Sequence, residues 1–148
     1  MKAPFWHIFF GLFFVLVAVF AFVSLEAAGR LSSWIPLSDF GLMTLAIFRL
    51  IRLFTYDNIT AFMREWFVGA DPSTLRGALG MLVNCPWCTG LWFALMVVFF
   101  YFLTPIAWYV ILVLALAAAA SFLQLLTNFI GWSAEAKKRE TQSIALPR

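Results

Sequence analysis

The uncharged stretch from Phe5 to Leu25 limits what this chain can fold into more than any other feature. A helix that crosses a bilayer needs about 20 apolar residues, whereas the apolar core of a signal peptide has roughly 7–15. We therefore expect an uncleaved membrane anchor. The rest of the 148-residue chain agrees, because 64% of it is hydrophobic and only 11% is charged. This composition excludes both a water-soluble globular protein and a disordered one.

Three further apolar segments follow, at residues 38–54, 86–103 and 106–132. The first of them is short and contains Arg49 and Arg52 near its end. Together with the anchor at residues 5–25, they predict four transmembrane helices in a single membrane domain, 1–148. The expected fold class is all-α, an integral membrane helical bundle. Four spans would place both termini on the same side of the membrane.

The basic residues predict which side that is, because Lys and Arg are enriched in cytoplasmic segments of membrane proteins. With both termini inside, every Lys and Arg except Arg30 falls in an inner segment. We therefore expect a protein of the cell inner (cytoplasmic) membrane with both termini in the cytoplasm. Its basic tail at residues 134–148 is expected to be helical only at its start. The basic residues are few and scattered, so no nucleic-acid partner is expected.

The inner segment at residues 55–85 has an amphipathic pattern. Its large apolar residues recur at the spacing of one helix face: Ile59, Phe62, Met63, Trp66 and Phe67. This predicts a helix on the cytoplasmic face of the membrane, in the headgroup layer, with Asp57 as its N-cap. A second short helix is expected from Asp71 to about Leu82.

Cys85 and Cys88 belong to a Cys-Pro-Trp-Cys motif at the start of the third expected span. Proline favours the first turn of a helix, so Cys85 would lie near the N-cap, where backbone amides stabilise a thiolate. Three interpretations stay open: packing of a helix entrance, a reversible thiol redox pair, and a metal site shared by two chains of a homodimer.

One chain has only two Cys and one His, too few ligands for a tetrahedral metal site, so we expect no metal and no cofactor. His7, at the start of the first span, is interpreted as an interfacial residue. No catalytic residue is expected beyond the candidate cysteine pair.

Arg49 and Arg52 are three residues apart and therefore share one helix face. Arginine within a span is costly, but near a helix end its side chain can extend to lipid phosphates. Asp57 and Glu65 are available as ion-pair partners. We expect an interfacial ion-pair cluster, with binding of an anionic lipid headgroup or another anionic ligand as the alternative.

Small and polar residues form a stripe along the fourth expected span: Ala117, Ser121, Gln124 and Asn128. Small side chains let helices approach closely, and Gln or Asn can hydrogen-bond across the contact. The stripe predicts helix packing, which includes contact with a second copy or another membrane protein. The lining of a pore is the alternative, although the stripe holds no ionisable residue.

Four short motifs follow one another along the chain: Arg49-Leu50-Ile51-Arg52-Leu53, Asp57-Asn58-Ile59-Thr60, Arg64-Glu65, and Cys85-Pro86-Trp87-Cys88-Thr89-Gly90-Leu91-Trp92. In this order they resemble a bacterial membrane family, domain of unknown function 1360, which includes sporulation-labelled and phage proteins. The resemblance extends from about Phe40 to Asn128, and Thr89 departs from the aliphatic residue expected there. It implies a helical membrane protein without an established activity. It also groups the two arginines, Asp57, Arg64 and the cysteine pair as one unit.

No motif of an enzyme class stands out, because Gly-rich phosphate loops and the GxSxG and HExxH patterns are absent from the sequence. An enzyme is therefore the less favoured class. We expect a small multi-pass protein that presents its cysteine motif, its interfacial arginines and its basic tail to a membrane-protein partner or to anionic lipid of the inner leaflet. A membrane thiol redox protein or sensor that uses Cys85 and Cys88 is the alternative. A holin-like pore protein of phage origin is a second alternative.

Overall fold

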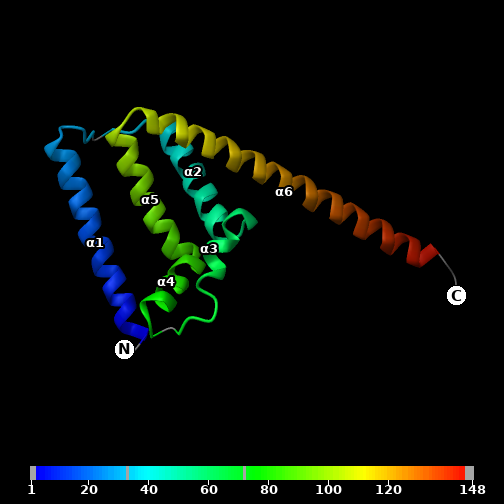
Figure 1. Cartoon of the computed structure of the whole chain (residues 1–148). Helices are drawn as coiled ribbons and strands as arrows, with labels where there is room; N and C mark the ends of the chain where they lie inside the picture. The colour runs from blue at the N-terminus through cyan, green and yellow to red at the C-terminus, as the bar shows by residue number, and fades with distance from the viewer. Residues whose placement is uncertain (1–2, 33, 72, 146–148) are drawn as a thin grey trace.

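The computed structural model describes residues 3–32, 34–71 and 73–145. Within these ranges the regular structure is helical throughout, so the expected all-α class is confirmed there. Figure 1 shows the elements in chain order: α1 (Ala3–Ala27), α2 (Leu37–Thr55), the 3-10 turn η1 (Asn58–Thr60), α3 (Ala61–Glu65), α4 (Leu75–Asn84), α5 (Pro86–Leu103) and α6 (Ile106–Ala145).

Three helices in the described part of the chain are long and apolar enough to cross a membrane, not the four that were predicted. They are α1, α5 and α6, with candidate spans at Phe5–Ala27, Pro86–Leu103 and Ile106–Thr141. α2 has sufficient length, at 19 residues, but it contains Asp39, Arg49 and Arg52. Three charged side chains in so short a helix make it less apolar than α1, α5 and α6.

α1 and α5 run in the same direction, and α2 runs in the opposite direction on the other side of α5 (Figure 1). α4 lies against the start of α1, where the indole Nε1 of Trp6 donates a hydrogen bond of 2.9 Å to the carbonyl of Ser73. Further along, the ring of Trp92 on α5 meets Phe13 and Phe14 of α1. One end of the bundle therefore gathers α3, α4 and the starts of α1 and α5. We call it the α3–α4 end.

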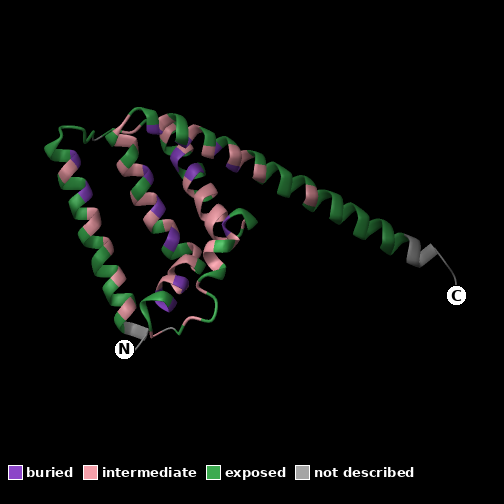
Figure 2. Cartoon of the chain, in the orientation of Figure 1, coloured by how far each residue is buried: buried purple, intermediate pink, exposed green. Residues whose placement is uncertain are grey.

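The main buried cluster lies between α2, α5 and α6 (purple in Figure 2). Ala46 of α2 and both Ala115 and Ala118 of α6 are at most 1% exposed. Such small side chains let two helices approach closely, which explains the tight contact of α2 with α6. The larger members of the cluster are Met43, Val97 and Ile111.

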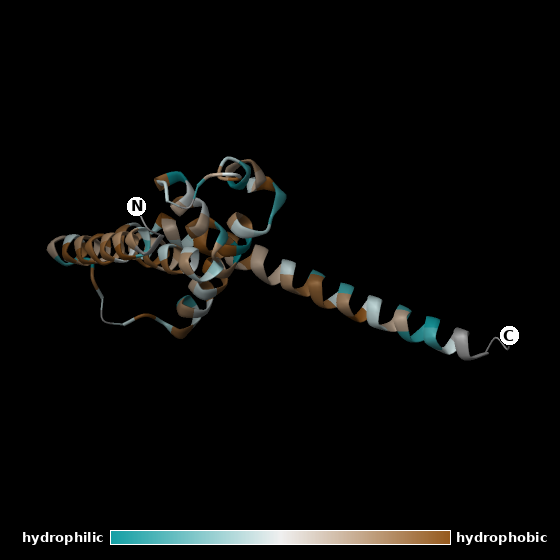
Figure 3. Cartoon of the chain, turned by 90° about the horizontal axis from the view of Figure 1, so that it is seen from below, coloured by the Kyte–Doolittle hydropathy of each residue, from teal (hydrophilic) through white to brown (hydrophobic). Residues whose placement is uncertain are grey.

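α1 and the second half of α6 pack much less. On α1, the side chains of Ile8 and Leu12 are 65% and 67% exposed. α6 projects from the bundle as a single helix (Figures 1 and 3), and Phe122 and Phe129 on this part are exposed. Apolar surfaces of this kind are suited to contact with lipid or another helix. α6 continues as far as Ala145, so the basic tail is helical further than expected, and residues 146–148 lie outside the described part.

The segment after α2 is less regular than its amphipathic pattern predicted. The 3-10 turn η1 leads into α3, which has only 5 residues. The chain then turns at Gly69, whose φ of 75° is a left-handed conformation that favours glycine. Ile59, Phe62 and Trp66 are nevertheless exposed, so the apolar surface that the pattern indicated is present on a shorter element.

The caps of this segment also differ from expectation. α4 begins later than predicted, because Thr74 is its N-cap and its hydroxyl accepts a hydrogen bond of 3.2 Å from the N–H of Gly77. The carboxylate of Asp71 instead accepts from the N–H of Ser73, in the turn before the helix. Asp57 precedes η1, but its side chain makes no cap hydrogen bond.

Candidate functional site

The cysteine motif forms the beginning of α5. Cys85 is the N-cap with an extended backbone, and Pro86 follows it in the first turn, as the fixed φ of proline favours. The thiol of Cys85 accepts a hydrogen bond of 3.3 Å from the backbone N–H of Cys88. The same turn brings the two sulfur atoms to 2.6 Å from each other. Both cysteines are free thiols, and Cys85 is half-buried whereas Cys88 is exposed.

The surroundings of the pair favour the thiolate of Cys85. The hydrogen bond from the Cys88 thiol lowers the pKa of Cys85 most, and the backbone N–H of Cys88 lowers it further, while partial burial opposes both. Only the thiolate is a nucleophile toward another sulfur or an electrophilic carbon. Cys85 is therefore well placed for the nucleophilic role in this pair.

A cavity of about 440 Å³ lies beside the pair, between α1, α4 and α5. Both cysteines line it, together with His7 and the aromatic side chains of Phe10, Phe14 and Trp92. His7 is far from the motif in the sequence, and only the packing of α1 against α5 and α4 brings it to the same cavity. No local pattern indicates such a contact, which is why His7 was expected at the interface alone.

Metal binding has no donor set within the described residues, where no group of three His, Cys, Asp or Glu side chains could hold an ion. A metal site with two thiolates from each of two chains, one of the three interpretations of the cysteine motif, stays a prediction.

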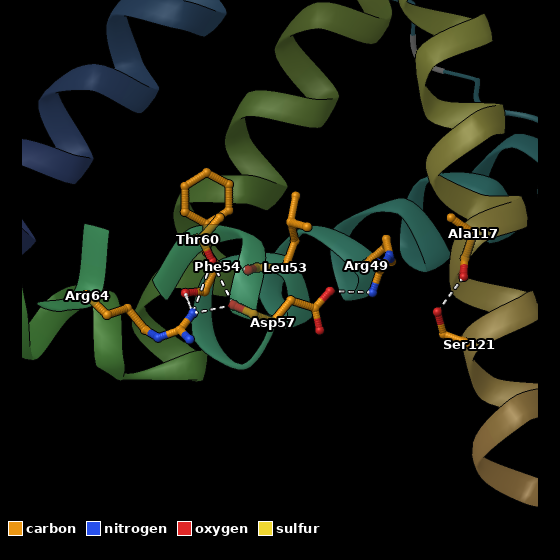
Figure 4. Close-up of polar contacts among 8 residues, drawn as sticks. All are labelled: Arg49, Leu53, Phe54, Asp57, Thr60, Arg64, Ala117 and Ser121. Atoms are coloured by element: carbon orange, nitrogen blue, oxygen red, sulfur yellow. Dashed lines mark hydrogen bonds and ion pairs between the residues drawn. The ribbon is translucent and has the colours of Figure 1, made fainter. Parts of the chain in front are cut away.

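Arg49 and Asp57 form an ion pair at the end of α2 (Figure 4). Nη1 of Arg49 lies 2.8 Å from a carboxylate oxygen of Asp57, and the two side chains are 21% and 27% exposed. An ion pair with this much exposure contributes at most about 1 kcal/mol to stability. Its structural effect is to hold the chain after α2 against the last turns of that helix.

Arg64 caps the end of α2 (Figure 4). Its Nη1 donates hydrogen bonds to the carbonyls of Phe54, at 3.0 Å, and Asp57, at 2.9 Å, and to the hydroxyl of Thr60, at 3.0 Å. The buried Thr60 in turn donates to the carbonyl of Leu53. The last carbonyls of a helix have no partner within it and carry partial negative charge, so a guanidinium is favourable there. Arg64 thereby joins α3 to α2.

Arg52 and Glu65 are placed differently from the rest of the expected cluster. The guanidinium of Arg52 lies over the ring of Tyr56, 5.8 Å from its centre, and its buried Nε has no hydrogen-bond partner. Glu65 is exposed and takes part in neither of the ion pairs found in the described ranges. The structure therefore brings Arg49, Asp57 and Arg64 together and leaves Glu65 outside.

A polar cluster at the opposite end of the bundle was not expected. The hydroxyl of Tyr101 donates a hydrogen bond of 2.6 Å to the carboxylate of Asp39, and the indole Nε1 of Trp108 donates to its other oxygen at 3.4 Å. These contacts join the start of α2 to the end of α5 and the start of α6. An acidic residue beside an apolar segment was visible in the sequence, but both of its partners lie on other helices.

Comparison with known proteins assigns the family. The profile of a family described as "Protein of unknown function (DUF1360)" matches residues 68–127. The UPF0713 protein YngL of Bacillus subtilis (strain 168) is 33% identical over 97 residues, which cover 57% of this chain and 75% of YngL. The chain belongs to the DUF1360 family. The sporulation protein YjcA of the same organism is 31% identical to it over 104 residues, 59% of this chain and 88% of YjcA. No solved structure matches the chain.

In this DUF1360 protein, the family profile covers one part of the candidate site, the cysteine pair, and does not reach the other part, the arginine cluster. The profile covers α4, α5 and the first part of α6, and so includes Cys85 and Cys88. The residues of the expected arginine cluster all precede it: Arg49, Arg52, Asp57, Arg64 and Glu65. The profile match is also shorter than the region from Phe40 to Asn128 that the motifs indicated.

The stripe expected on the fourth span lies on α6 of the DUF1360 protein and bonds along its own helix. The hydroxyl of Ser121 donates 2.8 Å to the carbonyl of Ala117 (Figure 4), and the amide of Gln124 donates 3.1 Å to Asn128. Contact of the stripe with a second copy or another protein stays a prediction. Within the chain, the buried face of α6 is formed by other residues: Ala107, Ile111, Ala115 and Ala118.

Proposed function

We propose that this DUF1360 protein carries a thiol–disulfide redox couple, Cys85 and Cys88, at the α3–α4 end of its bundle. The observation that carries the proposal is the contact of the two sulfur atoms, 2.6 Å apart across the first turn of α5. Because the sulfur atoms already touch, oxidation needs little movement of the backbone. The lowered pKa of Cys85 supports the same role, since thiol–disulfide chemistry proceeds through a thiolate.

Packing of the helix entrance, the other interpretation of the motif in a single chain, accounts for less of the geometry. A packing role suits two buried side chains, whereas Cys88 is exposed and both thiols face a cavity. The cavity gives a reactant access to the sulfur atoms, which a packing role does not need. A redox couple therefore accounts for the exposure, the sulfur contact and the cavity together.

We infer further that the α3–α4 end faces the cytoplasm, in the cell inner (cytoplasmic) membrane. Arg52, Arg64 and Arg76 lie on the last turn of α2, on α3 and on α4, at this end, whereas Arg30 donates to the carbonyl of Leu103 at the opposite end. The excess of basic residues on one side supports this orientation. α1 and α5 begin at the α3–α4 end, and α2 and α6 begin at the opposite end (Figure 1). In this orientation α2, despite its charged residues, runs back across the bilayer beside α5, and a crossing α6 then returns the C-terminus to the side of the N-terminus.

Trapping of thiols in living cells tests the redox proposal. Cells that express the full chain are quenched with acid before and after a pulse of diamide, and free thiols are then labelled with a heavy maleimide. We expect the thiols of Cys85 and Cys88 both to lose their maleimide labelling in the pulse and to regain it during recovery. In the Cys85→Ser and Cys88→Ser variants, labelling of the remaining thiol should stay the same throughout. Thiols that stay labelled throughout the pulse would overturn the proposal.

We propose a second role for the surface of α3, as a contact for anionic lipid of the inner leaflet or for a membrane-protein partner. This surface is formed by Ile59 of η1, Phe62 of α3 and Trp66 directly after α3, which are 72%, 69% and 65% exposed. The guanidinium of Arg76 lies 5.7 Å from the centre of the Trp66 ring, which places a positive charge beside this apolar surface. An apolar surface edged by positive charge is typical of elements that lie in an anionic headgroup layer.

A photo-reactive benzoylphenylalanine in place of Phe62 distinguishes the partners. A lipid adduct on irradiation of whole cells would indicate the headgroup layer, and an adduct of larger mass would indicate a protein partner. The same substitution at Trp34, exposed near the opposite end, is the control. Adducts equal at both positions would contradict a specific role of α3.

A further inference from the structure

A second cavity continues the first one along the same two helices. It has a volume of about 280 Å³, and Val17, Ala21 and Phe99 are among its lining residues. Trp92 lines both cavities. On α1 the lining residues recur every three or four positions from His7 to Ala21, so one face of that helix forms a continuous wall. We call the two cavities together the α1–α5 groove.

The first cavity has the chemistry of a site for a flat ring with polar edges. Its volume of about 440 Å³ lies within the roughly 300–1,000 Å³ of small-molecule sites. The aromatic side chains of Phe10, Phe14 and Trp92 offer faces on which a ring can pack. The polar side chains of its wall are the two thiols and His7, whose ring can donate a hydrogen bond to an oxygen atom.

The second cavity has a different character and suits an aliphatic chain. Apart from Trp92, which it shares with the first cavity, its lining consists of hydrocarbon and thioether side chains. α1, which forms one wall, is largely exposed along its length. In a bilayer the exposed side of α1 meets acyl chains, so a lipid-soluble molecule reaches the groove without leaving the membrane. The groove therefore combines a ring site beside the thiols with an apolar channel that leads away from them.

We propose that the α1–α5 groove binds a prenylated quinone, with its ring beside Cys85 and Cys88 and its chain in the second cavity, and that this quinone oxidises the cysteine pair. This inference rests on the proposed redox couple and names its electron acceptor. In the reaction two S–H bonds break and one S–S bond forms, while the two electrons and two protons convert the quinone to its hydroquinone. The ring N–H groups of His7 and Trp92 can each donate a hydrogen bond that holds a quinone oxygen during the transfer.

The test uses the purified full chain in lipid nanodiscs, reduced and kept free of oxygen. The probe is a short-chain ubiquinone, whose fully substituted ring blocks direct addition of a thiol. We expect the quinone absorbance to fall by one equivalent per chain, while the protein mass falls by two hydrogen atoms. Replacement Gly11→Leu should slow this reaction at least about tenfold, because a Cβ at Gly11 meets no atom within 4 Å and the larger side chain fills the cavity.

The matched control is Gly41→Leu, in α2, where an added Cβ also meets no atom within 4 Å. It should react with quinone at the wild-type rate. If diamide forms the Cys85–Cys88 disulfide but ubiquinone does not, or if Gly11→Leu reacts as fast as Gly41→Leu, the quinone site is wrong and the redox couple stands. If neither oxidant forms the disulfide, the redox couple fails and the quinone site fails with it.

Discussion

At the scale of single residues, Arg64 holds the α3–α4 end of the bundle in its observed form. One of its guanidinium nitrogens donates to two carbonyls and one hydroxyl, which belong to the last turn of α2, to Asp57 in the loop after it, and to Thr60 of η1. A hydrogen bond from a charged donor stabilises a fold more than a neutral one, and its loss leaves partly buried acceptors without a partner. Arg49 adds an ion pair with Asp57 to the same loop.

Replacing Arg64 with Gln should therefore lower the free energy of unfolding by roughly 1–3 kcal/mol. Unfolding by dodecyl sulfate in mixed micelles, followed by circular dichroism, measures the change. The control is Arg139→Gln, which removes an exposed ion pair with Glu135 within α6 and should cost less than about 0.5 kcal/mol. Equal effects of the two substitutions would contradict the capping role of Arg64.

The acidity of Cys85 gives a second prediction at this scale. The reactive form is the thiolate, so a lowered pKa moves the rise of the alkylation rate with pH to a lower pH than for an ordinary thiol. Iodoacetamide labelling, resolved for Cys85 by peptide mass spectrometry, gives this profile. Cys88→Ala removes the hydrogen bond that lowers the pKa most and should move the profile back to higher pH. A profile that Cys88→Ala leaves unchanged would rule out this cause.

At the scale of elements, close contact between α4 and the chain that follows α3 depends on a glycine. A Cβ built on Gly80 would lie only 2.8 Å from the Cβ of Phe67. Real Cβ atoms do not approach a neighbouring Cβ so closely, and a Cβ, unlike the end of a long side chain, moves only with its backbone. α4 can therefore approach this segment only because residue 80 has no side chain.

Gly80→Ala should accordingly lower the free energy of unfolding by roughly 1–3 kcal/mol, the usual cost of overpacking. Gly11→Ala is the matched control, because its Cβ meets no atom within 4 Å and alanine is the better helix former by about 1 kcal/mol. The same micelle unfolding measurement should therefore show a loss for one substitution and no loss for the other. A neutral Gly80→Ala would mean that α4 is not held against Phe67.

The sequence predicted the elements best where one pattern dominates. The third apolar segment was expected at 86–103, and α5 has these bounds, because Pro86 fixes its start and Pro105 follows its end. α2 also lies close to its predicted range, but its charged residues set it apart from the three helices that are long and apolar enough to cross a membrane. In the segment after α2, α3 ends at Glu65 and the chain turns at Gly69, although the apolar spacing continues past Glu65.

Within the candidate site, only the features formed by residues close together in the sequence could be predicted. The place of Cys85 at a helix N-terminus follows from the proline after it, and the Arg49–Asp57 pair joins residues close in sequence. His7 and the cavity depend on how α1 packs against α4 and α5. The contact of Asp39 with Tyr101 likewise depends on the packing of α2 against α5. Contacts of this kind leave no periodic pattern in either segment.

At the scale of the whole molecule, the bundle has two ends of different chemistry. The α3–α4 end holds the cysteine pair and Arg49, Arg52 and Arg64, and the other end holds Arg30 and the carboxylate of Asp39 among aromatic side chains. The arginines at one end give the proposed orientation its physical basis, because basic residues are retained on the cytoplasmic side.

Labelling from outside the cell tests that orientation. In a Cys85→Ser, Cys88→Ser background, Ser32→Cys places a thiol between α1 and α2, and Ser73→Cys places one just before α4. A membrane-impermeant maleimide should label residue 32 in intact cells and residue 73 only after permeabilisation. The reverse pattern would place the α3–α4 end outside and contradict the proposed topology.

A redox titration of the purified chain shows directly whether Cys85 and Cys88 form a redox couple. The protein is equilibrated in buffers of reduced and oxidised dithiothreitol and of reduced and oxidised glutathione, which together cover the potentials of known two-cysteine couples, then alkylated and analysed by mass spectrometry. We expect one two-electron transition in which an intramolecular disulfide joins the two cysteines. Thiols that remain reduced in every buffer, or disulfides that form only between chains, would mean that Cys85 and Cys88 are not a redox couple.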